Sequence, residues 1–264
     1  MMDIVKYPRT QHIQGSRLQE GDEDLSAVPF SHMAGKNVVV EEKMDGANSA
    51  ISYDENARQR LQSRGHYLVG GASEKHFHLF KQWAATHTEC LYHVLGSRYI
   101  CYGEWLFAKH TMFYDLLPHF WLEFDVFDRE AGEFLSTPRR IELLRGLPIV
   151  SVRVLFSGRL TSYKETISLL GTSAFISDEY LEKLTKQSAK LELPEQQVRK
   201  ETDMSRSMEG LYIKVEEDGV VKERYKFIRS GFLTTVLESE SHWLNRPIVP
   251  NMLRSGVNIY AKEQ

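Results

Sequence analysis

The sequence contains only two cysteines, Cys90 and Cys101, among 264 residues. Two cysteines are too few for a disulfide framework, and their spacing is not that of zinc ligands, so we expect packed thiols. No apolar run approaches the roughly 20 residues that cross a bilayer. The N-terminus also lacks the basic, apolar and small-residue succession of a signal peptide. We therefore expect a globular, cytoplasmic protein without a membrane partner.

The sequence also has little excess charge, with a formal net charge of -3. Nucleic-acid-binding domains often carry a clearly basic balance, so this value neither indicates nor excludes a nucleic-acid partner. Local basic clusters occur at Arg139-Arg140 and from Lys222 to Arg229, and a phosphate-binding groove requires only a local field. The functional prediction therefore depends on motifs.

The histidines do not form a recognisable metal-binding pattern. His76, His78, His87 and His93 are irregularly spaced, and no set of carboxylates accompanies them. We therefore expect structural histidines here.

The order of predicted elements indicates one mixed domain over residues 1–264, because no repeat, low-complexity tract or Pro/Gly-rich linker interrupts it. The β-branched run before Lys43 and the run Ala50–Tyr53 after Asp45-Gly46 predict strand, turn and strand. Lys43 then lies at the end of a strand. We expect the first thirty residues, which are polar and rich in turn formers, to wrap the surface.

Other segments alternate between helix and strand signals. Apolar residues from Ser73 to Leu95 recur at helical spacing and predict one long or two short helices. The mixture predicts an α+β fold, with antiparallel sheets flanked by helices around a cleft. We expect further strands at Tyr99–Leu106, Phe120–Phe127, Leu211–Val215 and Val220–Ile228, with a hairpin at Asp218-Gly219 between the last two. Helices are expected to begin at Thr137-Pro138, running through Leu147, and at Ser162-x-x-Glu165. We also expect a helical insertion at about 160–207 and a short C-terminal tail at 230–264.

The segment Glu42-Lys43-Met44-Asp45-Gly46-Ala47-Asn48 carries the clearest chemical signal. A lysine at a strand end, followed by a glycine that permits a tight turn, presents an amine at the mouth of a cleft. Such an amine could attack phosphorus once it has lost its proton, for which burial, neighbouring cations or a metal must lower its usual pKa of about 10.4. Taken alone, the segment fits a surface turn with a solvated lysine better, because Lys-x-Asp-Gly is a common sequence.

This segment resembles motif I of the covalent nucleotidyltransferases, the superfamily of DNA ligases, RNA ligases and mRNA capping enzymes. The resemblance implies an adenylyltransferase (ATP-grasp-like) domain with the nucleotide cleft between its sheets. It also implies ATP as nucleotide, Mg²⁺ or Mn²⁺ as metal, and AMP bonded to Lys43. Five segments resemble the other motifs in the right order: Gln62-Ser63-Arg64-Gly65, Tyr102-Gly103-Glu104-Trp105-Leu106, Phe124-Asp125-Val126-Phe127-Asp128, Met208-Glu209-Gly210-Leu211-Tyr212-Ile213-Lys214 and Arg224-Tyr225-Lys226.

The resemblance gives each motif a role. The arginine of the second motif contacts the nucleotide sugar or the RNA end, and the first aromatic of Phe124–Asp128 stacks on the base, although Trp121 lies near enough to compete. Arginine replaces the usual first lysine of the last motif, which holds the triphosphate. Each residue alone could also be an ordinary surface or strand residue. The implied catalytic residues are Lys43, Asp45, Asn48, Glu209 and Lys226; the implied nucleotide-binding residues are Glu42, Lys43, Arg64, Glu104, Phe124, Glu209, Arg224 and Lys226; the implied metal ligands are Glu209 and Glu104.

Asn48 points to one branch of the superfamily. The pattern from Lys43 to Asn48 resembles that of RNA ligases related to the phage and trypanosome editing enzymes, and Gly103–Thr111 resembles an extended third motif of some of them. The resemblance implies an ATP-dependent RNA ligase that adenylylates a 5′-phosphate end and seals it to a 3′-hydroxyl, in RNA repair, with a separate kinase or phosphatase healing the ends. Asn48 is implied in the end-directed steps.

Chain length separates some alternatives. Only Phe227–Gln264 follow the last motif, too few for a five-stranded barrel, so we expect no OB-fold. This disfavours capping-type guanylyl transfer. A minimal DNA ligase and a non-catalytic nucleotide- or RNA-binding subunit remain as alternatives.

Overall fold

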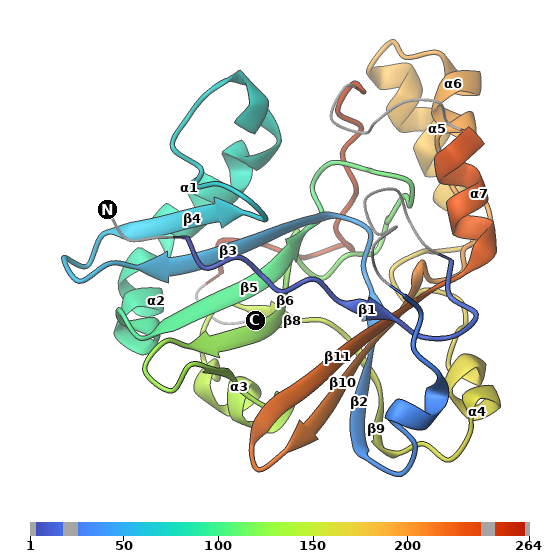
Figure 1. Ribbon diagram of the computed structural model, residues 1–264. Coiled ribbons are helices and arrows are strands. Elements are labelled where there is room, and N and C mark those ends of the chain that lie inside the picture. Colours follow the sequence, from blue (N-terminus) through green and yellow to red (C-terminus); the bar gives the residue numbers. More distant parts are fainter. Residues whose placement is uncertain (1–3, 18–25, 239–245, 262–264) are drawn as a thin grey trace.

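Two β-sheets form the centre of the molecule, and helices lie around them (Figure 1). The computed structural model describes residues 4–17, 26–238 and 246–261. Neighbouring strands are antiparallel, as predicted, except that β1 pairs with β11 and β8 pairs with β6 in parallel. The five-stranded sheet has the order β1 (Gln11–His12), β11 (Val220–Ile228), β10 (Gly210–Glu217), β2 (Asn37–Lys43) and β9 (Val154–Arg159), and the six-stranded sheet has the order β4 (Gln59–Ser63), β3 (Ala47–Tyr53), β5 (Tyr99–Trp105), β6 (Trp121–Asp128) and β7 (Glu133–Phe134), with β8 (Val150–Ser151) beside β6.

The chain passes from one sheet to the other between β2 and β3. β2 lies in the five-stranded sheet and ends at Lys43, whereas β3 lies in the six-stranded sheet and begins at Ala47. The predicted strand, turn and strand are therefore confirmed, but the two strands do not pair with each other. The crossing places Lys43 where the two sheets meet.

The five-stranded sheet has one apolar and one charged face, because side chains alternate along each strand. On the apolar face, β2, β10 and β11 pack against Ile13, Val28, Met33 and Leu160. The opposite face is turned toward the six-stranded sheet. It carries Glu41, Lys43, Tyr212, Lys214, Arg224 and Lys226, which follow from the register of the paired strands.

Helices cover the outer face of the six-stranded sheet. The helical stretch predicted from Ser73 forms a 3-10 turn, η2 (Ala72–Phe77), and two short helices, α1 (His78–Thr86) and α2 (Thr88–Leu95). Phe80 and Trp83 of α1 are fully buried in the core shared with β5 and β6.

The helix α3 (Thr137–Leu143) begins at the predicted Thr-Pro pair, with Pro138 in its first turn. It ends before the predicted Leu147, because the chain turns at Gly146, which has a φ of +79°. The predicted helix end was therefore wrong by four residues.

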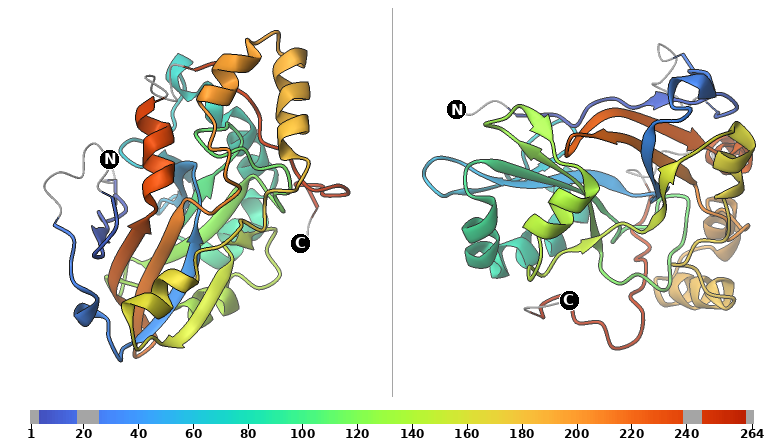
Figure 2. Two further views of the ribbon diagram at one scale, coloured as in Figure 1. Left: turned by 90° about the vertical axis from the view of Figure 1, so that its right-hand side faces the viewer. Right: turned by 90° about the horizontal axis from the view of Figure 1, so that it is seen from below.

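The range 160–207 contains three helices, α4 (Tyr163–Ser168), α5 (Tyr180–Lys190) and α6 (Glu195–Lys200). Ser162 caps α4, and its hydroxyl accepts the Glu165 N–H at 3.2 Å. The helices α5, α6 and α7 (Ser230–Glu238) gather at one end of the molecule (Figure 1, Figure 2). That the range is an insertion into a single domain stays a prediction.

The N-terminal segment departs from the expected surface wrapping. Tyr7, His12, Ile13 and Val28 are buried, and β1 extends the five-stranded sheet. In Figure 1, the segment before β1 crosses the face of the six-stranded sheet. Isolated buried residues among polar ones have no periodicity, so the sequence pattern did not reveal them. The short 3-10 turn η1 (Phe30–His32) follows this segment.

The hairpin between β10 and β11 confirms its sequence signal. Asp218 and Gly219 both have positive φ values, 53° and 79°, as a two-residue type I′ turn requires. Of the predicted tail 230–264, residues 239–245 and 262–264 lie outside the described residues. No helix in the described ranges is long and apolar enough to cross a membrane.

Candidate active site

Lys43 and Glu209 form an ion pair at the junction of the sheets. The register of β2 and β10 places Lys43 opposite Gly210. The Nζ atom of Lys43 donates a hydrogen bond of 2.6 Å to Oε1 of Glu209. The Glu209 side chain is buried, whereas 22% of the Lys43 side chain is exposed. The Lys43 side chain is thus partly open to solvent, whereas its partner is buried.

Glu104 approaches the same point from the six-stranded sheet. It lies opposite Asn48 in the pairing of β3 with β5, and its Oε1 atom accepts the Gly46 N–H at 3.1 Å. A Cβ atom at Gly46 would lie 2.6 Å from the Trp105 carbonyl oxygen. Only glycine therefore fits the crossing without a shift of the backbone.

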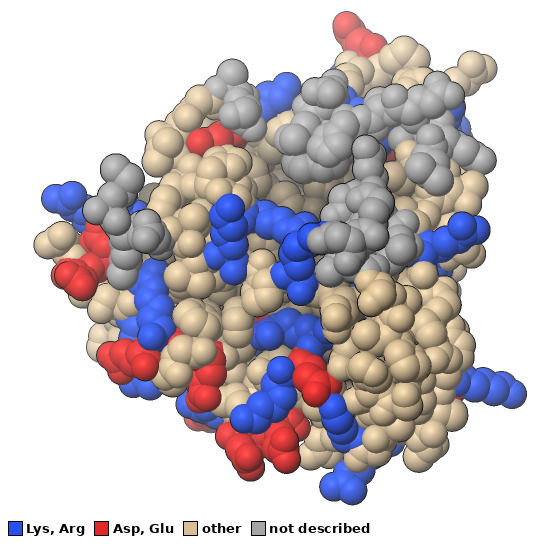
Figure 3. Space-filling view, viewed as in Figure 1, with Lys and Arg blue, Asp and Glu red and all other residues tan. Residues whose placement is uncertain are grey.

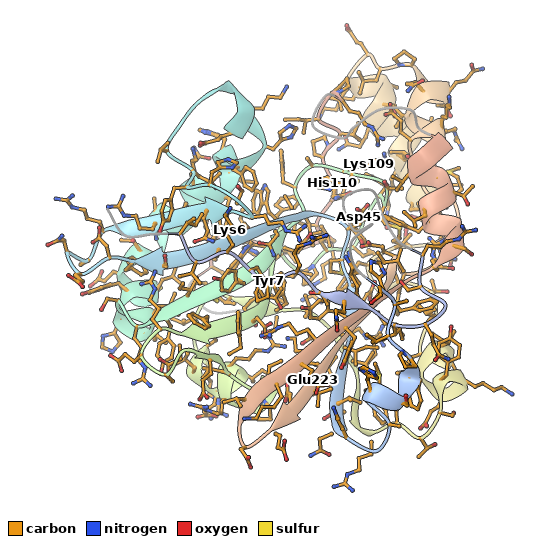
Figure 4. The ribbon with its side chains drawn as sticks, in the orientation of Figure 1. Lys6, Tyr7, Asp45, Lys109, His110 and Glu223 are labelled. Carbon is orange, nitrogen blue, oxygen red and sulfur yellow. The ribbon has the colours of Figure 1, made fainter. Side chains whose placement is uncertain are left out.

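Asp45 organises the loop after β5. Its Oδ2 atom accepts the N–H groups of Thr111 at 2.7 Å and Met112 at 2.6 Å, and its own N–H donates to the Tyr114 hydroxyl at 3.0 Å. Nδ1 of His110 lies 4.0 Å from Oδ1 of Asp45. Figure 4 shows Asp45, Lys109 and His110 close together above the junction.

Burial and mutual charge perturb this group strongly. Burial alone would lower the pKa of Lys43, but the negative charges of Glu209, Glu104 and Asp45 outweigh it and raise that pKa. Burial raises the pKa of Glu104 to about 8 and that of Glu209 to about 7, although Lys43 opposes both shifts. Lys43 therefore carries a proton in this state.

The two carboxylates fit a divalent cation that is bound together with a nucleotide. Oε2 of Glu209 is buried without a hydrogen-bond partner. The described part of the chain contains no group of three or more His, Cys, Asp or Glu side chains placed to hold a metal. Mg²⁺ commonly takes one or two carboxylates and completes its shell with substrate phosphates and water, so Glu209 and Glu104 would supply the protein ligands.

Phe124 lies at an irregularity of β6 and is partly exposed. Its ring contacts those of Tyr7 and Tyr212, with centroid distances of 5.1 and 6.3 Å. Trp121, the competing aromatic, is fully buried against Trp83 and donates its Nε1–H to Ser49. Of Phe124 and Trp121, Phe124 is thus the one that remains partly exposed.

The two basic residues of the last motif occupy different surroundings. The charge of Lys226 acts on Glu209, which places Lys226 near the pair of Lys43 and Glu209. Nε of Arg224 instead donates to the Tyr7 hydroxyl at 3.0 Å and to Oδ2 of Asp125 at 3.1 Å. The arginine that replaces the usual lysine therefore neutralises a buried carboxylate, and the expected triphosphate contact for Arg224 stays a prediction.

Three other residues of the expected set lie around the pair. Asn48 has a buried Oδ1 atom without a hydrogen-bond partner. Arg64 is exposed and follows Ser63, which pairs with Ser49, so it lies at the end of β4 beside the Asn48 region. The Glu42 carboxylate points to the opposite face of β2, where the Ser173 hydroxyl donates to it at 2.5 Å. The structure therefore does not bring the Glu42 side chain to Lys43.

A buried charge network lies beneath the site and was missed by the sequence analysis. Nζ of Lys214 lies 3.0 Å from Glu41 and 3.2 Å from Asp125. Arg140 is fully buried and paired with Glu41 and Glu123. Arg140 belongs to the local basic pair Arg139-Arg140 of the sequence, but its charge is used inside the protein and is not available to a phosphate. In the sequence, the one signal of this network is Lys214, a lysine in the middle of the apolar run of β10.

Comparisons with known proteins agree with this geometry. The model of the RNA ligase family matches residues 36–228. An RNA ligase variant from Naegleria gruberi with AMP and Mn superposes with a TM-score of 0.55 at 15% identity, covering 89% of this chain and 59% of that one. Another variant of that ligase, with ATP and Mn, gives a TM-score of 0.52 at 15% identity, covering 79% and 54%. The chain thus spans under three fifths of these proteins, and no curated protein sequence matches it.

The structural likeness confirms the predicted α+β nucleotidyltransferase fold. The family match covers the segment that runs from before Lys43 to just past Lys226, and so includes the motifs of the sequence analysis. The chain therefore belongs to the RNA ligase family.

Proposed function

We propose that the chain is an ATP-dependent RNA ligase that seals a 5′-phosphate end to a 3′-hydroxyl through a lysyl-AMP intermediate on Lys43. The observation that carries this proposal is the 2.6 Å contact between Lys43 Nζ and Glu209 at the crossing between the sheets, with Glu104 beside it. The family match and the Naegleria ligase variants with ATP, AMP and Mn support the same nucleotide and metal class.

In the first step, the Lys43 amine attacks the α-phosphorus of ATP. Nζ is protonated in this state and must lose its proton before it attacks, and Oε1 of Glu209, which contacts Nζ, is placed to take up that proton. A nitrogen–phosphorus bond forms, the bond to the oxygen that bridges the α- and β-phosphorus breaks, and pyrophosphate leaves. Lys226 stabilises the negative charge that develops on the phosphates. A divalent cation at Glu209 and Glu104 would supply further positive charge there.

In the second step, an oxygen of the RNA 5′-phosphate attacks the same phosphorus and releases Lys43. In the third step, a 3′-hydroxyl attacks the 5′-phosphate, forms the phosphodiester and releases AMP. Asn48 has a buried acceptor without a partner, and buried polar atoms normally have one. An RNA end would supply this partner, which agrees with a role for Asn48 after adenylylation of Lys43.

A sealing assay with nicked duplexes tests the proposal. Labelled nicks of all-RNA, mixed and all-DNA composition are incubated with ATP and Mg²⁺. We expect sealing of nicks with RNA strands and a much lower rate on all-DNA nicks. Asn48→Ala should keep lysyl-AMP formation but lose sealing. Preferential sealing of all-DNA nicks would instead make the chain a DNA ligase, and no sealing of any nick would leave a binding subunit.

We extend the proposal to RNA repair, because the chemistry requires a 5′-phosphate and a 3′-hydroxyl. Broken RNA with other termini must first be healed by a separate kinase or phosphatase. Cleaved RNA with a 5′-hydroxyl and a cyclic phosphate should therefore be sealed only after treatment with a polynucleotide kinase-phosphatase. Sealing without this treatment would contradict the proposal that a separate enzyme must heal the ends.

A further inference from the structure

A cavity opens where the N-terminal segment separates from β11. β1 pairs with β11 at Tyr225 and Lys226, and the residues before Gln11 diverge from the strand. The wedge between them encloses about 560 Å³ and is lined by Arg9, Arg224 and Lys222 among others. Figure 3 shows Lys and Arg side chains gathering near the middle of this face.

The cavity has a positive character. Arg9 and Lys222 are exposed, and Nη2 of Arg224 is buried without a hydrogen-bond partner. One carboxylate, that of Glu223, also lines the cavity. It accepts hydrogen bonds from Lys36 at 2.7 and 2.9 Å and from the Tyr225 hydroxyl at 2.6 Å. Its charge is therefore compensated, and the cavity favours an anion.

The Lys222 end of the cavity is too far from Lys43 for the phosphates of the same nucleotide. Ile228 and Gly210 are paired, and Gly210 is paired with Lys43. Lys222 precedes Ile228 by six positions, which corresponds to roughly 20 Å along the strand. A nucleotide with its α-phosphate at Lys43 cannot place its terminal phosphate there.

The charged residues of β11 lead from this cavity to the catalytic pair. Arg224 and Lys226 emerge on the same face of β11, because one residue separates them. Lys222 lies at the bulge where the pairing of β11 with β10 shifts, and it lines the cavity together with Arg224. A nucleic-acid strand with one end at Lys43 would pass over this row. Cationic contacts to phosphates fix the register of such a strand without reading its sequence.

We propose that the cavity binds a backbone phosphate of the RNA strand, several nucleotides from the end that reacts at Lys43. The inference rests on the proposed ligase function for the identity of the strand. Arg9 and Lys222 supply the exposed charges, and Arg224 lines the inner wall. Arg9 and Lys222 hold RNA in place and take no part in the reaction of ATP with Lys43.

The test separates RNA binding from the reaction with ATP. The variants are Lys222→Glu and the double variant Arg9→Glu/Lys222→Glu. The matched control is Lys164→Glu/Lys190→Glu, which reverses two exposed charges on α4 and α5. Affinity for a fluorescein-labelled single-stranded RNA with a 5′-phosphate is measured by anisotropy over a series of salt concentrations. Lysyl-AMP formation is measured with α-labelled ATP.

We expect the double variant to raise the RNA Kd about tenfold and to reduce the slope of log K against log salt by about one. Lys222→Glu should give part of this effect, and both variants should form lysyl-AMP within about twofold of the unmodified chain. RNA binding equal to that of the control would overturn the inference. Loss of lysyl-AMP formation with unchanged RNA binding would also overturn the inference, because it would show that the cavity binds ATP rather than RNA. If the unmodified chain forms no lysyl-AMP, the proposed function fails, whereas the RNA-binding comparison still decides on the cavity.

Discussion

The Nζ atom of Lys214 lies 3.0 Å from Oε2 of Glu41, and both side chains are fully buried. The same amine also contacts Asp125 at 3.2 Å. Breaking a buried ion pair on one side leaves an uncompensated charge and typically costs about 3–5 kcal/mol. We therefore expect Lys214→Met to lower the free energy of unfolding by that amount, as measured by urea denaturation.

The control for this prediction is Lys222→Met, which removes an exposed lysine from the neighbouring strand β11. It should change the free energy of unfolding by about 0.5 kcal/mol or less. If Lys214→Met were as stable as this control, the buried network would not contribute as we argue.

Tyr7 joins the N-terminal segment to both sheets through its hydroxyl. That group donates to Asp125 at 2.5 Å, lies 2.7 Å from the Tyr212 hydroxyl and accepts from Arg224 at 3.0 Å. Tyr7→Phe keeps the ring but leaves these buried groups short of a partner, at a cost of about 1–3 kcal/mol. Denaturation of Tyr7→Phe beside Tyr92→Phe, whose tyrosine is partly exposed, measures the difference. Equal stability of the two variants would refute the prediction.

Gly46 has no room for a side chain. A Cβ atom would lie 2.6 Å from the Trp105 carbonyl oxygen and 2.9 Å from Cγ of Glu104. Gly46→Ala should therefore displace the Lys43 crossing or Glu104, and we expect lysyl-AMP formation to fall at least about tenfold, since small misplacements at a reacting centre cost up to about a hundredfold. Gly171→Ala is the control, because its Cβ would meet no atom within 4 Å. Equal rates for both variants would count against this geometry.

His119 predicts a dependence of stability on pH. Burial lowers its pKa from 6.5 to about 4, and its Nδ1 accepts the Trp121 N–H at 2.9 Å. The unfolded chain therefore takes up the proton first. The neutral imidazole makes its full contribution to the free energy of unfolding above pH 6.5. This contribution, about 3 kcal/mol, is lost as the pH falls from about 6.5 to 4.

Comparison of the unmodified chain with His119→Asn isolates this contribution from that of other groups. Unfolding free energies are measured in urea at several pH values between 7 and 4. Between pH 7 and pH 4, the free energy of unfolding should decrease less in the variant than in the unmodified chain, by up to about 3 kcal/mol. Parallel curves for the two proteins would show that His119 is not buried in its neutral form.

Local signals predicted the position of Lys43 well. A β-branched run before it and a glycine after it determine a strand end and a tight turn, and the structure places Lys43 there. The Asp218-Gly219 turn was predicted for the same reason, because its backbone angles depend on these two residues alone. Both features are local, so residues adjacent in the sequence are sufficient to predict them.

Contacts between distant positions were not predictable in this way. Tyr7 meets Asp125 and Tyr212 across 118 and 205 positions. Lys214 resembles a solvated strand lysine until the register of β10 with β2 places it beside Glu41. Arg140 resembled a surface cation for the same reason. Pairing of strands far apart in sequence, rather than local preference, decides where these charges lie.

The central claim is that Lys43 becomes covalently bonded to AMP. The purified chain is incubated with α-labelled ATP and Mg²⁺ and then separated by denaturing electrophoresis, beside Lys43→Ala and the exposed-lysine control Lys164→Ala. We predict retained label on the unmodified chain and on Lys164→Ala, and none on a folded Lys43→Ala. Label on Lys43→Ala, or no label on the folded unmodified chain, would contradict the account.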